Sequence, residues 1–138
     1  MHRMNWDEKL ATRHPGMARD HRKMVGLINR LGEVMAEGKG KFAYCTVFDE
    51  IVRQTRQHFE MEEQLMAAHH YPKAEEHKAE HASLLKKLLK HKHGVEEGDG
   101  EITDSLLHFL DFWWTHHILT SDEEMAEFIV SSAPTGLN

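Results

Sequence analysis

Apolar residues recur three and four positions apart along four long stretches of the chain, the spacing that places them on one face of an α-helix. Glycine or proline, the residues that stop helices, stands in each break between the stretches. The pattern therefore predicts four helices. They run from about Met17 to Glu37, from about Phe42 to Ala68, from about Pro72 to His93 and from about Ile102 to Val130.

Short connections between long helices force neighbouring helices to run antiparallel, which predicts an all-α, up-down-up-down four-helix bundle. The length of 138 residues suits a single domain, which we expect over residues 1–138. Its bundle is expected over about 17–131. Before it, residues 1–16 are expected to wrap across the bundle as a non-helical segment, and after it a short C-terminal tail is expected to fray.

The predicted inward face of every helix contains histidine. On the fourth helix this face is read as Leu106, Phe109, Trp113, His117 and Thr120. Two pairs of candidate residues lie one turn apart and therefore share a helix face: His58 with Glu62, and His77 with His81. The inward histidines and carboxylate are His21 on the first helix, His58 and Glu62 on the second, His77 and His81 on the third, and His117 on the fourth.

Histidine is also the outlier of the composition, with 13 in 138 residues. A single histidine on an apolar face is usually a hydrogen-bonded core residue. Burying five imidazoles and a glutamate without partners would cost several kcal/mol each, and metal coordination removes that cost. The joint pattern predicts a metal site. No metal is needed to explain His2, His14, His69, His70, His91, His93 and His108, and spacing alone leaves open whether His116 or His117 faces the site.

The number and type of candidate ligands narrow the kind of metal site. Five imidazoles and a carboxylate exceed the four positions of a zinc site, and the chain has no His-Glu-x-x-His sequence and no cysteine cluster. Two ions are therefore indicated. No histidine has a glutamate three residues before it, so the Glu-x-x-His pairs of ferritin-like carboxylate proteins are absent.

These residues resemble the hemerythrin family, and in particular its bacterial members. The resemblance spans about Trp6 to Phe128. Its motifs are Asp20-His21 followed by Leu27-Ile28-Asn29, His58-Phe59-Glu60-Met61-Glu62-Glu63, His77-Lys78-Ala79-Glu80-His81, and Trp113 through Asp122. The resemblance selects His117 over His116 and adds Asp122. The metal ligands that it implies are His21, His58, Glu62, His77, His81, His117 and Asp122.

The resemblance implies two iron ions joined by an oxo or hydroxo bridge and by the two carboxylates. Three histidines would hold one iron, and His21 and His58 the other, which keeps one coordination position open for molecular oxygen. The expected function is reversible oxygen binding for transport, storage or delivery, without enzymatic activity. An apolar pocket around the open position would exclude water.

The chain departs from the family pattern in two places. Trp114 stands where the family usually has leucine, and we expect Trp113, Trp114 and Ile118 to line the oxygen pocket, although the two tryptophans would equally fill core or a helix interface. The segment before His21 lacks the usual acidic residue, which puts support for that histidine in doubt. His117 and Asp122 are five residues apart, about 140° on an ideal helix, so both reach one site only on a broad face or a locally loosened helix.

Other function classes are less favoured. The net charge is −6 without a basic block, so nucleic acid is not an expected partner. No long apolar run suggests a membrane span or a signal peptide, and we expect a cytoplasmic, monomeric protein. The alternatives are a di-iron redox enzyme acting on peroxide or nitric oxide, against which the lack of further inward carboxylates argues, and an oxygen-sensing or iron-handling module.

Overall fold

The structure, a computed structural model, describes Met4, residues 14–97 and residues 104–132. In this part of the chain every element is helical. The elements are α1 (Pro15–Ala36), α2 (Lys41–Ala68), α3 (Ala74–Glu97), α4 (Asp104–His117), the π-helical segment η2 (Ile118–Asp122) and α5 (Glu123–Ser132). The last three follow one another directly and form one long helix.

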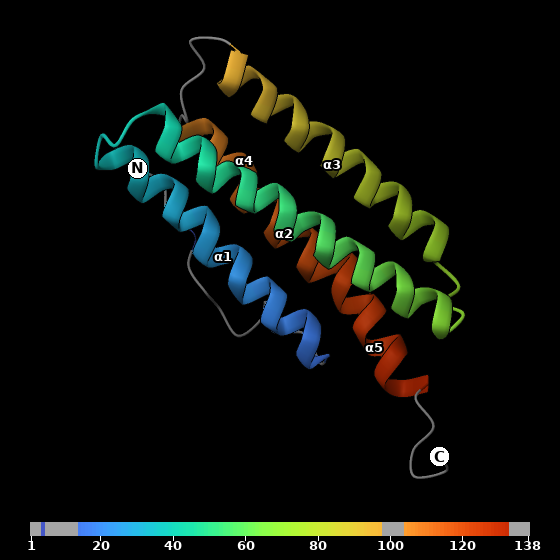
Figure 1. The fold of residues 1–138 in the computed structure, drawn as a ribbon. Coiled ribbons are helices and arrows are strands. Elements are labelled where there is room, and N and C mark those ends of the chain that lie inside the picture. Colours follow the sequence, from blue (N-terminus) through green and yellow to red (C-terminus); the bar gives the residue numbers. More distant parts are fainter. Residues whose placement is uncertain (1–3, 5–13, 98–103, 133–138) are drawn as a thin grey trace.

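The helices form an up-down-up-down bundle, as predicted (Figure 1). Helix α2 lies between α1 and α3, and the four long helices alternate in direction along the chain, with α4, η2 and α5 counted as one. The long last helix completes the bundle, with α4 packed against α1 and α5 packed against α2. None of the described helices is long and apolar enough to cross a membrane.

Local chemistry explains where the first helix begins and ends. Pro15 occupies the first turn, where its missing N–H is no loss, and the His14 ring nitrogen Nδ1 accepts a hydrogen bond from the Met17 backbone N–H at 3.2 Å. This histidine, which needed no metal in the sequence analysis, is thus a helix cap. After the helix, Gly38 adopts a φ of 66°, a left-handed conformation that glycine tolerates best.

The predicted end of the third helix at about His93 is wrong. Helix α3 continues through Gly94 to Glu97. The extra turn buries Val95, which is 4% exposed and belongs to the core. The Lys41 ammonium donates a hydrogen bond to the Glu96 carbonyl at 2.6 Å and ties this turn to the start of α2. Burial and this contact outweigh the cost of about 1 kcal/mol for glycine inside a helix.

The predicted inward face of the fourth helix is also partly wrong. Thr120 is exposed, and Phe109 and Trp113 are only partly buried. The buried face instead follows the neighbouring row, which passes through Trp114 and Ile118. Of the predicted face, Leu106 and His117 are buried as expected.

The expected non-helical segment 1–16 is described only at Met4 and at 14–16, and Pro15 and Gly16 already belong to α1, so its predicted end is slightly too late. The loop at 98–103 and the tail at 133–138 lie outside the described residues. Met4 packs into the bundle. It is 1% exposed, and its backbone N–H and C=O both pair with the Asn29 side chain, at 2.7 and 2.6 Å. At this position the segment packs onto α1.

Two apolar clusters of buried side chains make up the core. The larger cluster occupies the end of the bundle near the α1–α2 connection, and the smaller one gathers residues from the opposite ends of α1, α2 and α5. The smaller cluster consists of Met17, Met66, Tyr71, Met125, Ala126 and Ile129. The inward histidines lie along the helices between these two clusters, in a region screened from water on both sides.

Candidate metal centre

Five histidines and two carboxylates, contributed by every helix of the bundle, meet at one buried place. Their ligand-type atoms form two groups, within each of which the atoms lie within 4.8 Å of one another. One group contains Glu62, His77, His81, His117 and Asp122, and the other contains His21, His58, Glu62 and Asp122. The structure thus brings together all seven residues that the resemblance implies, and their role as ligands stays a prediction.

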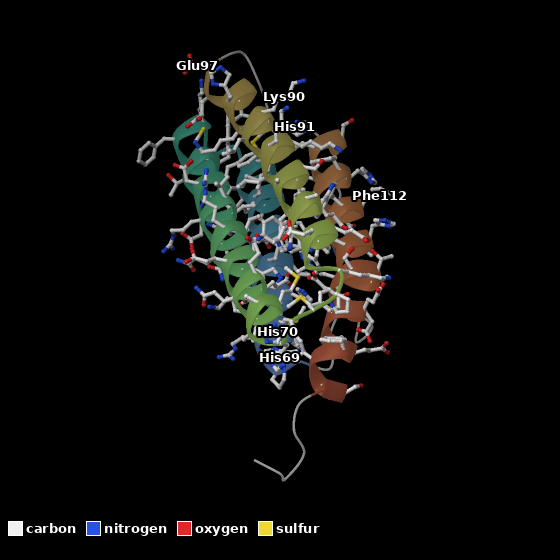
Figure 2. The ribbon with its side chains drawn as sticks, turned by 90° about the vertical axis from the view of Figure 1, so that its right-hand side faces the viewer. His69, His70, Lys90, His91, Glu97 and Phe112 are labelled. Carbon is white, nitrogen blue, oxygen red and sulfur yellow. The ribbon has the colours of Figure 1, made fainter. Side chains whose placement is uncertain are left out.

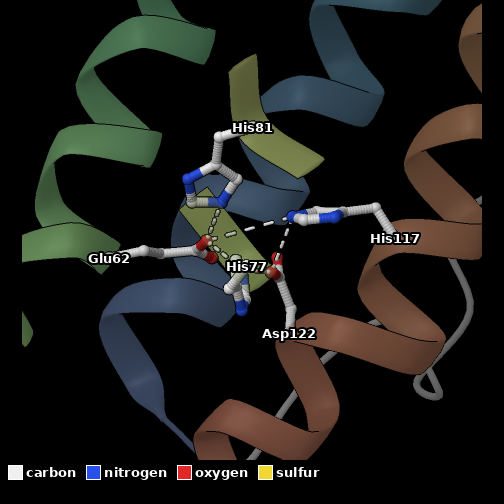
Figure 3. Close-up of side chains that lie close together, drawn as sticks. All are labelled: Glu62, His77, His81, His117 and Asp122. Carbon is white, nitrogen blue, oxygen red and sulfur yellow. Dashed lines mark hydrogen bonds and ion pairs between the residues drawn. The ribbon is translucent and has the colours of Figure 1, made fainter. Parts of the chain in front are cut away.

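Glu62 lies between the two groups and turns one carboxylate oxygen toward each. Its Oε1 is 2.8 Å from His81 Nε2 and 3.1 Å from His77 Nε2 (Figure 3). Its Oε2 is 2.7 Å from Nε2 of His58, which lies one turn earlier on α2. A carboxylate with one oxygen toward each of two adjacent sites has the arrangement of a bridging ligand.

Asp122 repeats this arrangement from the opposite helix. Its Oδ1 is 2.7 Å from His117 Nε2 and 3.1 Å from His77 Nε2. Its Oδ2 is 2.8 Å from His21 Nε2 and 3.4 Å from His58 Nε2. The two groups therefore share both carboxylates, while three imidazoles belong to one side and two to the other.

The π-helical segment η2 brings Asp122 to the site. The Glu123 backbone N–H donates to the Ile118 carbonyl, a five-residue spacing that adds one residue to the turn. Residues five apart then share a face, so His117 and Asp122 reach the same carboxylate-rich core. Of the two solutions expected from the sequence, the local loosening of the helix is the one observed.

Three of the histidines are held from behind by carboxylates. His58 Nδ1 is 3.0 Å from Asp20, His81 Nδ1 is 3.0 Å from Glu63, and His117 Nδ1 is 2.6 Å from an oxygen of Glu80, whose other oxygen accepts a hydrogen bond from Ser121 Oγ at 2.6 Å. Such partners orient imidazole ligands and raise their basicity. Each fixes a histidine with its inward Nε2 available to the centre.

Sequence reasoning missed these supporting residues. Asp20 and Glu63 stand in the motifs quoted for the resemblance, but no role was predicted for either. Asp20 supports His58 on the next helix, and Glu63 supports His81. One sequence feature could have found them: each supporting carboxylate is the immediate neighbour of a predicted ligand. Neighbouring residues point about 100° apart around a helix, so such a side chain can reach toward an adjacent helix.

Burial and the neighbouring carboxylates shift the pKa values of the buried histidines in opposite directions. Burial lowers the pKa of His77, but hydrogen bonds to Asp122 and Glu62 outweigh it and raise that pKa to about 9. For His58, burial again lowers the pKa, and the charge of Glu62 with further hydrogen bonds raises it well above its ordinary value. In the metal-free protein, imidazolium charges thus compensate the buried carboxylates.

The seven residues fit a metal ion. Glu62 and Asp122 are both 0% exposed, and two carboxylates buried together need compensating positive charge. Glu62 Oε2 and His117 Nε2 have no hydrogen-bond partner within the described ranges, although each has a potential partner only 2.7 Å away. Close approach without hydrogen-bond alignment is what atoms arranged around a shared ion show. Imidazole nitrogen and carboxylate oxygen together suit transition metals such as iron.

Aromatic rings enclose the imidazoles. Phe59 stacks on His81, with ring centroids 3.8 Å apart, and Trp113 stacks on His117 at 5.0 Å. Trp114 and Ile118, the other predicted pocket residues, are 1% and 0% exposed. Trp114 therefore lies within the buried wall of the site, whereas Trp113 is partly exposed and covers the outer side of one imidazole.

The remaining described histidines lie away from the centre. His70, His91, His93, His108 and His116 are exposed, and His69 is partly exposed. Figure 2 shows His69 and His70 at the end of α2 and His91 on α3, near the opposite end of the bundle. The choice of His117 over His116 agrees with this placement.

Histidines and carboxylates gathered from all helices in the core of a bundle define a metal-binding four-helix bundle protein. The family model described as "Hemerythrin HHE cation binding domain" matches residues 15–129. The chain therefore belongs to the hemerythrin family.

Similar proteins support this membership. A bacteriohemerythrin of Stenotrophomonas maltophilia (strain R551-3) is 29% identical over 122 residues, covering 88% of this chain and 78% of that protein. A bacteriohemerythrin of Pseudomonas aeruginosa (strain LESB58) is 28% identical over 117 residues, covering 85% and 75%. A crystal structure of a leucine-to-phenylalanine mutant superposes with a TM-score of 0.84 at 22% identity, covering 91% and 96%, and this likeness supports the fold.

Replacing Glu62 with alanine should lower metal occupancy more than any other single carboxylate change on α2. Glu62→Ala removes an oxygen from both groups, whereas Glu63→Ala removes only a hydrogen bond to His81 and should weaken metal affinity by about 10–100-fold. Glu60→Ala, an exposed change on the same helix, is the control. Metal content after equilibrium dialysis checks the order, and equal occupancy in the Glu62 and Glu60 variants would contradict the bridging arrangement.

The metal-free protein should lose stability between about pH 6.5 and pH 9. The pKa of His77 rises from 6.5 to about 9 on folding, so its contribution is complete below about pH 6.5 and is lost as the pH rises through 9. The pKa values of His58 and His117 are also raised by folding, so these residues contribute to the same loss of stability. Bound metal keeps histidines deprotonated, so the loaded protein should not show this loss. Urea unfolding across this range, with and without metal, measures both, and a flat metal-free profile would contradict the electrostatic description.

Proposed function

We propose that this protein binds molecular oxygen reversibly at a non-haem di-iron centre and serves oxygen transport, storage or delivery. The observation that supports this most directly is the pair of shared carboxylates. Glu62 and Asp122 each turn one oxygen toward a three-histidine side and one toward a two-histidine side. This asymmetric arrangement suits two bridged iron ions, one of which retains a free position.

The iron ions, when bound, would supply both the coordination position for oxygen and the electrons for its reversible reduction. The chain itself contributes positioning and exclusion of water. Asp20, Glu63 and Glu80 hold the rings of their histidine partners, and Phe59 and Trp114 close the wall beside them. A dry, apolar wall favours reversible binding because it keeps out the water and protons that would release reduced oxygen.

We further propose that the protein is a binding protein and not an enzyme. The buried polar residues of the described bundle are accounted for as candidate ligands, apart from Gln54 and Thr55. Thr55 donates its hydroxyl hydrogen to the Ile51 carbonyl at 2.7 Å, so it offers no free acid. The buried Tyr71 lies near His77, but burial raises the pKa of its hydroxyl to about 12, so it is a weak proton donor. The similarity to bacteriohemerythrins is in keeping with oxygen as the ligand, while a cytoplasmic location and a monomeric state stay predictions.

The purified protein should hold two irons per chain and develop a reversible charge-transfer band when the ferrous form meets oxygen. Iron analysis and visible spectra before oxygenation, after it and after deoxygenation measure this. One zinc per chain, or no spectral change, would refute the proposal. Catalytic consumption of hydrogen peroxide or nitric oxide by the loaded protein would favour a redox enzyme instead.

Trp114→Leu should speed both oxygen binding and autoxidation. The change removes ring atoms from the wall beside His58 and opens a route for water as well as oxygen, while iron content should stay the same because no candidate ligand is touched. Phe112→Leu, a similar aromatic loss at a side chain that is 70% exposed and points outward on the same helix (Figure 2), is the matched control.

Stopped-flow and autoxidation measurements decide whether Trp114 controls access to the oxygen pocket or only fills space. Rates for Trp114→Leu that match the parent within about twofold, a barrier change below about 0.5 kcal/mol, would mean that the ring only fills space.

A further inference from the structure

Among the described residues, the buried indole N–H of Trp114 has no hydrogen-bond acceptor. The side chain is 1% exposed, and its indole Nε1 has no hydrogen-bond partner among the residues that the structure describes. Buried tryptophan N–H groups usually find a partner, and an unmet one is destabilising. A phenylalanine would keep an aromatic ring at this position without that penalty.

The indole ring that carries this donor lies in the wall of the candidate metal centre. The Trp114 ring centroid is 5.8 Å from that of His58 and 6.1 Å from that of His117, and it stacks near Phe59 at 5.9 Å. His58 belongs to the two-histidine side and His117 to the three-histidine side. The indole is therefore beside both halves of the centre.

Neither neighbouring histidine offers an acceptor to this N–H. Their Nε2 atoms face the shared carboxylates, and their Nδ1 atoms are paired with Asp20 and Glu80. The other two unpartnered buried atoms, Glu62 Oε2 and His117 Nε2, are explained by a metal ion. An indole N–H can only donate and cannot coordinate a cation, so the metal does not explain it.

We propose that the Trp114 N–H donates a hydrogen bond to the small ligand that the metal centre binds, and that it favours ligands with a negatively charged acceptor atom. This inference rests on the proposed function, whose exogenous ligand supplies the missing acceptor. The donor is already out of contact with water before the ligand arrives, so it pays no further desolvation penalty. A charge-assisted hydrogen bond in such surroundings is stronger than a neutral one.

Azide binding to the iron-loaded, oxidised protein tests the donor without relying on oxygenation. The chain has three tryptophans, and biosynthetic replacement by the analogue with sulfur in place of the indole N–H preserves the ring shape. In the parent sequence this replacement should weaken azide binding by about 10–100-fold, the effect of losing one hydrogen bond to a charged acceptor. Trp114→Phe should weaken it similarly.

The same analogue introduced into the Trp114→Phe variant is the control. There it alters only the other tryptophans, so azide affinity should not change further. An independent measurement uses the unmodified protein: the ultraviolet Raman signal of the indole N–H, taken as the difference between parent and Trp114→Phe. It should report a free N–H without metal and ligand and a hydrogen-bonded one after azide is added.

The outcomes separate this inference from the proposed function. An equal affinity of the analogue-containing and unmodified parent proteins, an equal loss in both backgrounds, or an indole already hydrogen-bonded in the metal-free protein would each overturn the donor role alone. A parent protein that holds no iron, or that holds iron and binds neither azide nor oxygen, would overturn both proposals.

Discussion

Two negative charges buried side by side are the constraint on which the rest of this structure depends. Glu62 and Asp122 are both fully buried and lie against the same histidine, His77. Carboxylates stay charged in a medium of low polarity only where positive charge or hydrogen bonds compensate them. The five imidazoles that compensate them come from all the helices of the bundle, so a slip of one helix by a turn, about 5.4 Å, would leave them uncompensated. The site therefore favours one relative position of the helices, and that position in turn assembles the site.

The supporting carboxylates extend this constraint from one helix to the next. Asp20 on α1 holds His58 on α2, Glu63 on α2 holds a histidine of α3, and Glu80 on α3 holds His117 on α4. Every step links consecutive helices, so each interhelical packing contact in chain order carries its own polar connection. The polar network thus follows the topology of the bundle and keeps the shared centre in one arrangement.

Sequence reasoning reached the bundle and most of the candidate ligands because helical periodicity and the spacing of histidines are properties of single helices. The family resemblance, and not the spacing, chose His117 over His116 and added Asp122. Sequence reasoning failed where a contact between helices decides the outcome. The third helix passes Gly94 because Val95 finds a buried place, and Trp114 lies on the buried face of α4 because neighbouring helices pack against that face. The supporting role of Glu63 depends on which helix lies beside α2, which spacing along one helix does not reveal.

The centre brings together His21 and Asp122, which lie far apart along the chain. These residues are 101 positions apart yet 2.8 Å from one another, in the first and the last helix. An ion held by both closes a chain loop of about 100 residues, and loop-entropy estimates for a cross-link of that size are about 4–5 kcal/mol. A bound metal would therefore be a removable cross-link between the two ends of the fold. The supply of that metal would then govern how long each copy resists opening and proteolysis.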